Sequence, residues 1–166
     1  MPDTEVLPAV TTFTLRRDRC VAEPSIRLLG LPLLRARLTA TGGHFDDLDL
    51  TVVLDAASLR PGVKPLRRPL TGRRGLRAAD HPAITFTGDV EPDGGTIDVA
   101  GRLEVAGTSR DLRLRGDLRH VGDDRVLLWL KGFLPAPRRK PRGLGPLARL
   151  VATRRIHVEF AAEFVR

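Results

Sequence analysis

The residues of this chain that could do chemistry are few and far apart. Its four histidines stand at positions 44, 81, 120 and 157, and no two of them have the spacing of a helical zinc site. His157 and Glu159 would point to the same side of a strand and could contact one metal ion, but two solvent-facing polar positions explain them more simply. A deaminase-type His-x-Glu also needs a Pro-Cys-x-x-Cys motif, which a chain with one cysteine does not have. The histidines therefore predict no metal site.

Motifs for nucleophilic catalysis and for phosphate binding are also missing. None of the serines, Ser25, Ser58 and Ser109, lies in a Gly-x-Ser-x-Gly sequence. The chain has no P-loop and no Gly-x-Gly-x-x-Gly fingerprint. The aspartate pairs at 46–47 and 123–124 stand in predicted turns, where Asp is favoured because its side chain binds the local backbone. We therefore expect a protein that is not an enzyme and that uses no cofactor.

Alternating apolar residues between Pro82 and Asp117 indicate three consecutive strands. Every second position is apolar, and mostly polar residues stand between; the apolar positions are Ile84, Phe86, Ile97, Val99, Leu103, Val105, Leu112 and Leu114. A period of two places these side chains on one face of a sheet. The segments at 91–95 and 106–109 tolerate the backbone of hairpin turns. The stretch is therefore predicted to be an antiparallel meander.

The rest of the chain continues this strand pattern. We expect further strands at residues 11–17, 33–40, 47–55, 125–131 and 155–166, a short apolar piece at 25–29 and a turn at Gly42-Gly43. The segment at 125–131 is apolar on both faces, so it should be covered on both sides. About eight strands without helices between them favour an all-β antiparallel barrel or a sandwich. A closed up-and-down barrel of this size can hold one small ligand.

Two segments interrupt the pattern and predict long loops. Residues 58–80 and 132–146 are rich in Pro and Gly, which makes a sustained strand or helix there unfavourable. Residues 147–152 could form one or two helical turns.

Length and composition fit one domain. At 166 residues the chain can bury a substantial core, and we expect a tail at 1–10 followed by one domain at 11–166. The first ten residues have neither the apolar run of a secretory signal nor the length of a membrane helix. Cys20 is the single cysteine, so no internal disulfide can form, which agrees with a reducing compartment. These features predict a cytoplasmic protein.

The net charge of +8 is concentrated in two segments. Residues 60–77 hold seven basic side chains and no acidic one, and residues 131–155 hold eight and none. The remainder has 13 basic and 20 acidic residues, so an acidic body carries two basic loops. Four strands separate the two loops in an up-and-down meander, so both should leave the barrel at the same end. Arginine richness from a GC-rich genome is the simpler explanation of the charge, but it does not explain this distribution.

One stretch, residues 75–116, carries a specific set of positions: Leu76, Pro82, Ile84, Phe86, Gly101, Leu103, Val105, Gly107 and Thr108. This set resembles the central signature of the YceI-like, polyisoprenoid-binding family. The resemblance implies a lipocalin-like β-barrel whose apolar lumen holds a long isoprenoid chain, without catalytic residues. Two parts depart from the family pattern. Residues 17–20 stand near the place of its His-Ser pair, and residues 136–143 replace its Arg-x-Asp-Phe-Gly-like element.

From the pattern and the resemblance together, we expect a binding protein for an isoprenoid-type lipid. The predicted lumen residues are Phe13, Leu50, Val52, Ile84, Phe86, Leu103, Leu128 and Phe160. Arginine donates two hydrogen bonds to a phosphate at once, so the basic loops would form a mouth for an anionic head group or a membrane surface. The predicted mouth residues are Arg67, Arg68, Arg73, Arg74, Arg138, Arg139, Lys140 and Arg142.

Other functions stay open. Periodicity alone favours a solid core over a lumen, which would leave a structural or partner-binding protein. The basic loops could instead bind nucleic acid, but aromatic side chains for base stacking are scarce: the chain has no Tyr, one Trp, and Phe133 alone within the basic segments. Exposed apolar side chains such as Leu127 or Trp129 could mark the face of a homodimer.

Overall fold

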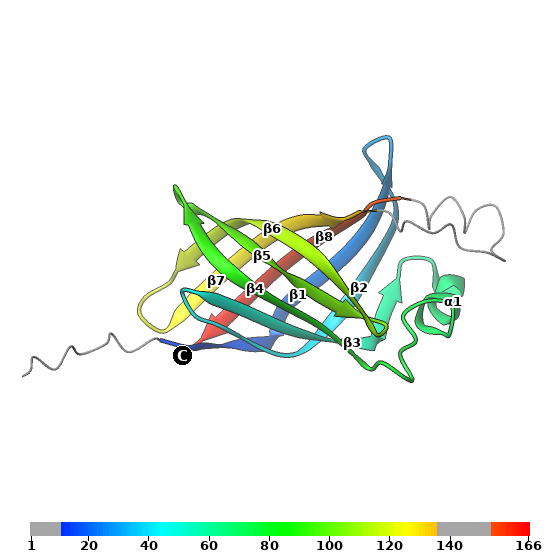
Figure 1. Ribbon diagram of the computed structural model, residues 1–166, viewed down its shortest axis with the longest axis horizontal. Coiled ribbons are helices and arrows are strands. Elements are labelled where there is room, and N and C mark those ends of the chain that lie inside the picture. The colour runs from blue at the N-terminus through cyan, green and yellow to red at the C-terminus, as the bar shows by residue number, and fades with distance from the viewer. Residues whose placement is uncertain (1–10, 136–153) are drawn as a thin grey trace, which may run out of the picture.

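The computed structural model describes residues 11–135 and 154–166, which form one closed antiparallel barrel (Figure 1). Each strand pairs with its neighbours in the chain, and β8 closes the barrel against β1. The strands are β1 (Phe13–Leu28), β2 (Leu31–Phe45), β3 (Asp49–Pro61), β4 (Ala83–Asp93), β5 (Thr96–Val105), β6 (Thr108–His120), β7 (Arg125–Leu134) and β8 (Ile156–Val165). The predicted up-and-down barrel of about eight strands is confirmed.

Alternating side chains explain why these segments close into a barrel. On β7, Val126, Leu128 and Leu130 are buried and point inward, while the side chains between them point to solvent. Buried and more exposed residues also alternate along β4. The inward side chains of all eight strands merge into one hydrophobic cluster. Removing this apolar surface from water is the main driving force that closes the sheet on itself.

β1 is longer than predicted because a bulge interrupts its alternation. Leu15 pairs with Phe164 and Cys20 pairs with Ala162, so four residues of β1 face a single residue of β8. The bulge shifts the inward positions from odd to even residue numbers, which hides the strand from a period-two pattern. The pieces expected at 11–17 and 25–29 are therefore two parts of one strand.

The predicted turn at Gly42-Gly43 is wrong, because both glycines lie inside β2. The pairing of β2 with β3 shifts register between Ala40 and Gly42, so the strand bends here without ending. A Cβ atom on Gly43 would lie 2.6 Å from the carbonyl oxygen of Thr51. Glycine is needed at this position because the two strands approach closely.

The connection from β3 to β4 contains two short helical segments. The loop expected over 58–80 is wrong at its start, because β3 continues to Pro61, where the residue pairs with Ala36. A 3-10 helix, η1 (Lys64–Leu66), and a five-residue helix, α1 (Arg67–Thr71), follow. Within residues 11–135 and 154–166, no helix has the length and apolar character needed to cross a membrane.

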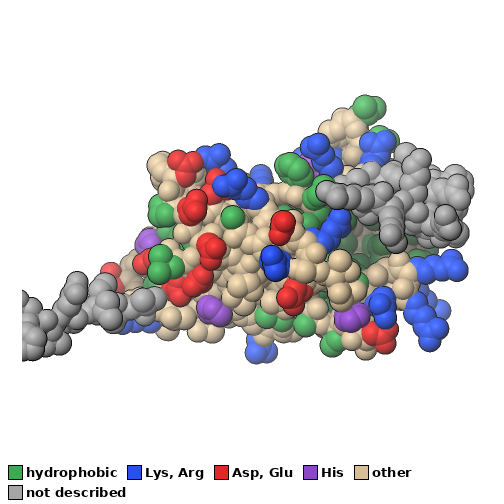
Figure 2. Space-filling view, in the orientation of Figure 1, with side chains coloured by type: hydrophobic (Ala, Val, Ile, Leu, Met, Phe, Trp, Pro, Cys, Tyr) green, Lys and Arg blue, Asp and Glu red, His purple; other side chains and the backbone are tan. Residues whose placement is uncertain are grey.

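The barrel has two ends of opposite charge. The β1–β2, β3–β4 and β5–β6 connections lie at what we call the basic end, and the β3–β4 connection alone carries six basic side chains and one acidic one. The other three turns lie at the acidic end, with Asp46, Asp47, Asp123 and Asp124. Figure 2 shows Lys and Arg side chains gathered at the end near α1 and most Asp and Glu side chains toward the opposite end. Because β3 and β7 run in the same direction, the segments that follow them begin at the same end.

Candidate functional site

The predicted lumen residues come together inside the barrel. Seven of the eight are buried, namely Phe13, Leu50, Val52, Ile84, Phe86, Leu128 and Phe160. The eighth, Leu103, lies on β5 and is partly buried against the main hydrophobic cluster. These residues belong to six strands, so closure of the barrel is what assembles them.

Aromatic rings fill the barrel at its acidic end. The rings of Phe45 and Phe164 are fully buried with centroids 5.9 Å apart, and the ring of Phe13 lies 6.4 Å from that of Phe45. Tilted aromatic pairs at these distances stabilise a core beyond the burial of their area. Leu50 and Val126, which are also fully buried, belong to the same cluster. This part of the interior is therefore packed core.

Toward the basic end, the interior is less completely buried on several strands. Along β5, Val99 is buried, whereas Leu103 and Val105, nearer the basic end, are only partly buried. Along β8, the same change runs from the buried Phe164 to the partly buried Val158. The inward residues of β4 and β7 stay buried near this end. Apolar side chains that point into the barrel are thus partly exposed near the basic end of β2, β5 and β8, and near the acidic end the same holds for Leu118 on β6.

Four of the predicted mouth residues lie at the basic end. Arg67 and Arg68 belong to α1, Arg73 and Arg74 follow it, and all four are exposed. Within the part of the chain that the structure describes, none of these four forms an ion pair. The other four predicted residues, Arg138, Arg139, Lys140 and Arg142, lie outside the described residues, as do the helical turns expected at 147–152.

Exposed leucines lie at the same end, which the sequence analysis did not single out. The β1–β2 hairpin turns at Leu29 and Gly30, whose φ angles of 51° and 81° make a tight connection. Leu29 is 94% exposed and Leu31 is 72% exposed. Val63, on the connection that follows β3, is also exposed. The sequence signal for these side chains is the leucine run around Gly30.

A second basic group at this end was also missed. Arg27, Arg154, Arg155 and His157 line a pocket of about 450 Å³. Arg27 lies at the end of β1, Arg154 and Arg155 directly precede β8, and His157 lies near the start of β8. Only the pairing of β1 with β8 brings them together, so no local motif could have revealed the group.

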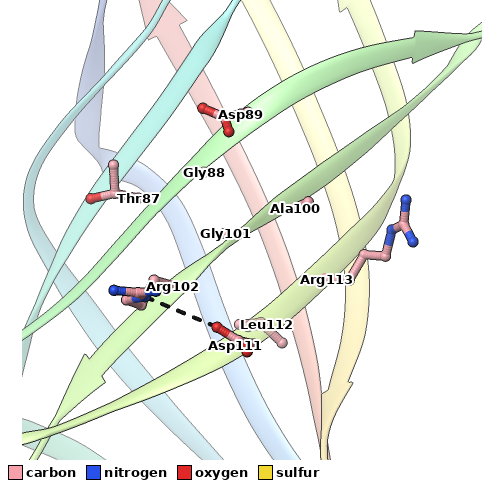
Figure 3. A pocket seen from close by; sticks show the side chains of 9 residues that line it. All are labelled: Thr87, Gly88, Asp89, Ala100, Gly101, Arg102, Asp111, Leu112 and Arg113. Atoms are coloured by element: carbon pink, nitrogen blue, oxygen red, sulfur yellow. Dashed lines mark ion pairs between the residues drawn. The ribbon is translucent and has the colours of Figure 1, made fainter.

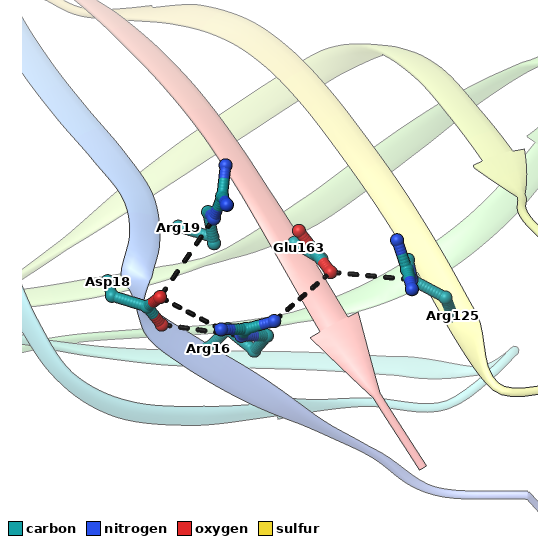
Figure 4. A network of polar contacts seen from close by, with 5 residues as sticks. All are labelled: Arg16, Asp18, Arg19, Arg125 and Glu163. Atoms are coloured by element: carbon teal, nitrogen blue, oxygen red, sulfur yellow. Dashed lines mark hydrogen bonds and ion pairs between the residues drawn. The ribbon is translucent and has the colours of Figure 1, made fainter.

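An ion-pair network at the acidic end connects the bulge of β1 to β8 and β7 (Figure 4). Glu163 lies 3.8 Å from Arg16 and 3.4 Å from Arg125. Arg16 also donates a hydrogen bond of 2.9 Å to Asp18, which lowers the pKa of that carboxyl below its ordinary value. Most of these groups are exposed, so the network fixes the shape of the bulge more than it stabilises the fold.

Cys20 follows the bulge and packs against the core. Burial raises the pKa of its thiol to about 11. Because the thiolate is the reactive form of cysteine, Cys20 is a packing residue at neutral pH and not a nucleophile.

A depression on the outer wall lacks the features of a binding site. It has a volume of about 540 Å³ and lies over β4, β5 and β6 (Figure 3). The paired Gly88 and Gly101 form part of its lining. Side chains of both charges surround it, and Arg102 lies 4.0 Å from Asp111. Its lining carries two acidic and two basic side chains and therefore favours no class of charged ligand.

The prediction that the strand at 125–131 is covered on both faces is wrong for the single chain. On the outer face of β7, Leu127 is 39% exposed and Trp129 is 49% exposed. The Trp129 indole donates a 2.9 Å hydrogen bond to Glu159, so one oxygen of this carboxylate already has a partner. A homodimer through this outer face of β7 stays a prediction.

Among residues 11–135 and 154–166, no group of three His, Cys, Asp or Glu side chains is placed to hold a metal.

Three solved structures have a similar barrel. BcnA of Burkholderia cenocepacia matches with a TM-score of 0.62 at 17% identity, over 90% of this chain and 98% of BcnA. A polyisoprenoid-binding domain from Saccharophagus degradans matches with a TM-score of 0.60 at 12% identity, over 94% and 98% of the two chains. The YceI protein of Campylobacter jejuni matches with a TM-score of 0.57 at 18% identity, over 86% and 84%. No protein-family model and no curated protein matches the sequence.

At identities of 12–18%, these matches establish a likeness of fold, and the likeness extends over most of each chain. The strands that carried the sequence resemblance, β4 and β5, lie side by side in the barrel, with Phe86 paired to Leu103. The chain therefore has the fold of the YceI proteins, a lipocalin-like antiparallel β-barrel.

Proposed function

We propose that this protein is a non-enzymatic binding or carrier protein for a polyisoprenoid or similar amphiphilic lipid. The observation that carries the proposal is the partly accessible apolar surface inside the barrel near its basic end, represented by Leu103 and Val158. An apolar chain buried there would gain about 0.8 kcal/mol per methylene-sized group. The polyisoprenoid-binding domain with the same fold supports the choice of ligand class.

The basic end would face an anionic head group or membrane surface. Arg67, Arg68, Arg73 and Arg74 are exposed there, and each would contribute about 1 kcal/mol near an anionic bilayer. The exposed Leu29 at the hairpin tip would enter the boundary between head groups and acyl chains. Because this is also the end where interior apolar surface is accessible, a lipid could move between bilayer and barrel without crossing bulk water.

Native mass spectrometry of gently purified protein, followed by solvent extraction, tests the proposal. We expect a retained lipid of isoprenoid mass, or uptake of an added polyprenyl alcohol. Leu103→Trp would fill the interior near the basic end and reduce uptake at least about tenfold. Leu127→Trp makes the same change on the outer face of β7 and should leave uptake unchanged. An empty protein that takes up no polyprenyl alcohol would mean that the interior is solid core.

Nucleic-acid binding through the same basic end is the competing function. Phe133 is half exposed, and the Arg155 guanidinium lies 5.0 Å from its ring centroid, which resembles the stacking arrangements of single-strand binders. A labelled single-stranded oligonucleotide, titrated at several salt concentrations, separates the two functions. Tight and strongly salt-dependent binding of the oligonucleotide without uptake of polyprenyl alcohol would replace the carrier proposal.

A further inference from the structure

The pocket formed by Arg27, Arg154, Arg155 and His157 lies where β1 ends and β8 begins. In the antiparallel register, Ile26 pairs with Ile156, so Arg27 and Arg155 follow next to each other at the edge of the barrel. Three guanidinium groups and an imidazole therefore line one space of about 450 Å³ at the basic end.

The positive charge of this pocket is not compensated. In residues 11–135 and 154–166, none of Arg27, Arg154 and Arg155 forms an ion pair. The Nε atom of Arg154 is buried and has no hydrogen-bond partner among the described residues. A buried donor on a charged group is costly when it is left unpaired, so this atom calls for an acceptor that the pocket does not itself supply.

The nearest carboxylates on this outer face are engaged elsewhere. Glu23 and Glu159 pair across β1 and β8, one row further along the barrel wall. Glu23 accepts a 2.6 Å hydrogen bond from Arg37, and Glu159 accepts one of 2.9 Å from Trp129. Of the described residues that line the pocket, none is acidic. The pocket is therefore a local excess of hydrogen-bond donors with positive charge.

An aromatic ring holds two of the donors in place. Phe133 on β7 pairs with His157, and the two ring centroids lie 6.4 Å apart. The guanidinium of Arg155 lies 5.0 Å from the centroid of the same ring. A planar cation placed over an aromatic face loses conformational freedom before any ligand arrives. The donors are thus partly preorganised.

We propose that this pocket binds a phosphate or diphosphate group. Arginine forks match the oxygens of a phosphate, and three of them with His157 can satisfy more acceptor atoms than a single carboxylate offers. The group could belong to a lipid head group or to a free anion. Only the lipid source rests on the proposed function, because it requires an apolar chain in the barrel interior.

Isothermal titration of the full chain with inorganic diphosphate tests the site by itself. Arg154→Gln and Arg155→Gln should each weaken binding at least about tenfold, because each removes charge-assisted hydrogen bonds. Arg119→Gln removes the same charge from an exposed position of β6 near the acidic end and should weaken binding less than about twofold. Absence of diphosphate binding to the natural sequence, or an equal loss in Arg119→Gln, would overturn the proposal. Thermal melts of the variants show that each is folded, and the exposed Arg155 keeps the test valid if Arg154→Gln does not fold.

Two further probes separate this site from the carrier proposal. Geranylgeraniol has the apolar chain without the anion, and geranylgeranyl diphosphate has both. Uptake of geranylgeraniol tests the barrel interior, whatever the arginine variants do. If geranylgeranyl diphosphate binds at least about tenfold more tightly than geranylgeraniol, and Arg155→Gln removes that difference, the lipid head group is the source. Inorganic diphosphate binding without geranylgeraniol uptake would support the anion site and contradict the lumen. Uptake of geranylgeraniol without binding of inorganic diphosphate would contradict the anion site alone.

Discussion

The two ends of the barrel differ in packing and in charge. At the acidic end, Phe13, Phe45 and Phe164 fill the interior, and aspartates occupy the turns. At the basic end, Leu103 and Val158 are only partly buried, and exposed leucines and arginines occupy the connections between strands. The fold thus separates a part that supplies stability from a part where, among the described residues, leucines are exposed and several arginines form no ion pair.

This separation teaches where substitutions should act. Changes at the acidic end should alter the free energy of unfolding, because they remove packing. Changes to exposed side chains at the basic end should leave stability nearly unaffected and alter binding, since these side chains remove little apolar surface from water.

The largest expected effect is on the aromatic layer. Phe164→Ala should lower the free energy of unfolding by about 3–5 kcal/mol, because it leaves a cavity beside Phe45. Phe133→Ala, a change of the same type in a half-exposed side chain near the basic end, should cost less than about 1 kcal/mol. Urea unfolding curves measure both. Equal losses in the two variants would contradict the difference in packing between the ends.

A second contrast uses two adjacent glycines in β2. Gly43→Ala places a Cβ atom 2.6 Å from the Thr51 carbonyl oxygen, so we expect a loss of about 1–3 kcal/mol. A Cβ on Gly42 would have no atom within 4 Å, so Gly42→Ala should be neutral or slightly stabilising. Thermal melts compare the two. If Gly42→Ala destabilised as much as Gly43→Ala, the close approach of β2 to β3 would not be the reason for glycine at 43.

The third contrast concerns membrane contact at the two ends. Replacing Leu29 and Leu31 together by Ser should weaken binding to vesicles containing anionic lipid about tenfold, because it removes exposed apolar groups at the basic end. Leu48→Ser changes a leucine that is 64% exposed at the acidic end and should have no effect. Vesicle co-sedimentation gives the affinities. An equal loss of vesicle affinity in Leu48→Ser would show that the protein does not bind the membrane with its basic end.

The smallest expected effect is a pH dependence at Cys20. The fold raises the pKa of this thiol from 9.0 to about 11, so the protonated form is favoured in the folded state. The contribution of this pKa shift to the stability of the fold is fully present below pH 9 and is lost as the pH rises toward about 11. Unfolding curves at these pH values should therefore show a modest loss of stability that Cys20→Ala removes. If the loss persists in Cys20→Ala, another group causes it.

The sequence predicted the central part of the barrel well because its alternation is uninterrupted. β4, β5 and β6 follow a strict period of two, and their turns have positive φ angles at Gly94, Gly95, Ala106 and Gly107, as the turn residues indicated. β1 and β2 were harder because each contains a register shift that changes which residues point inward. Periodicity cannot follow a strand through a bulge, since one extra residue reverses the faces.

The candidate site divides in a similar way. Residues that line the interior, such as Phe86 and Leu128, are marked by alternation within one strand. The pocket of Arg27, Arg154, Arg155 and His157 depends on the pairing of the first and last strands, which no local pattern specifies. Partial burial of Leu103 also depends on the whole barrel, so a solid core and a lumen give the same alternating pattern in the sequence.

Methyl NMR spectra of the protein with added polyprenyl alcohol show whether a lipid enters the barrel from the basic end. The account predicts chemical-shift changes concentrated in the inward methyl groups near the basic end, Leu103, Val105, Ile156 and Val158, with little change at Val126 near the acidic end. Leu127 on the outer face should also be unaffected. Shifts confined to outer methyl groups, or no shifts at saturating ligand, would contradict a lipid-binding interior that is reached from the basic end.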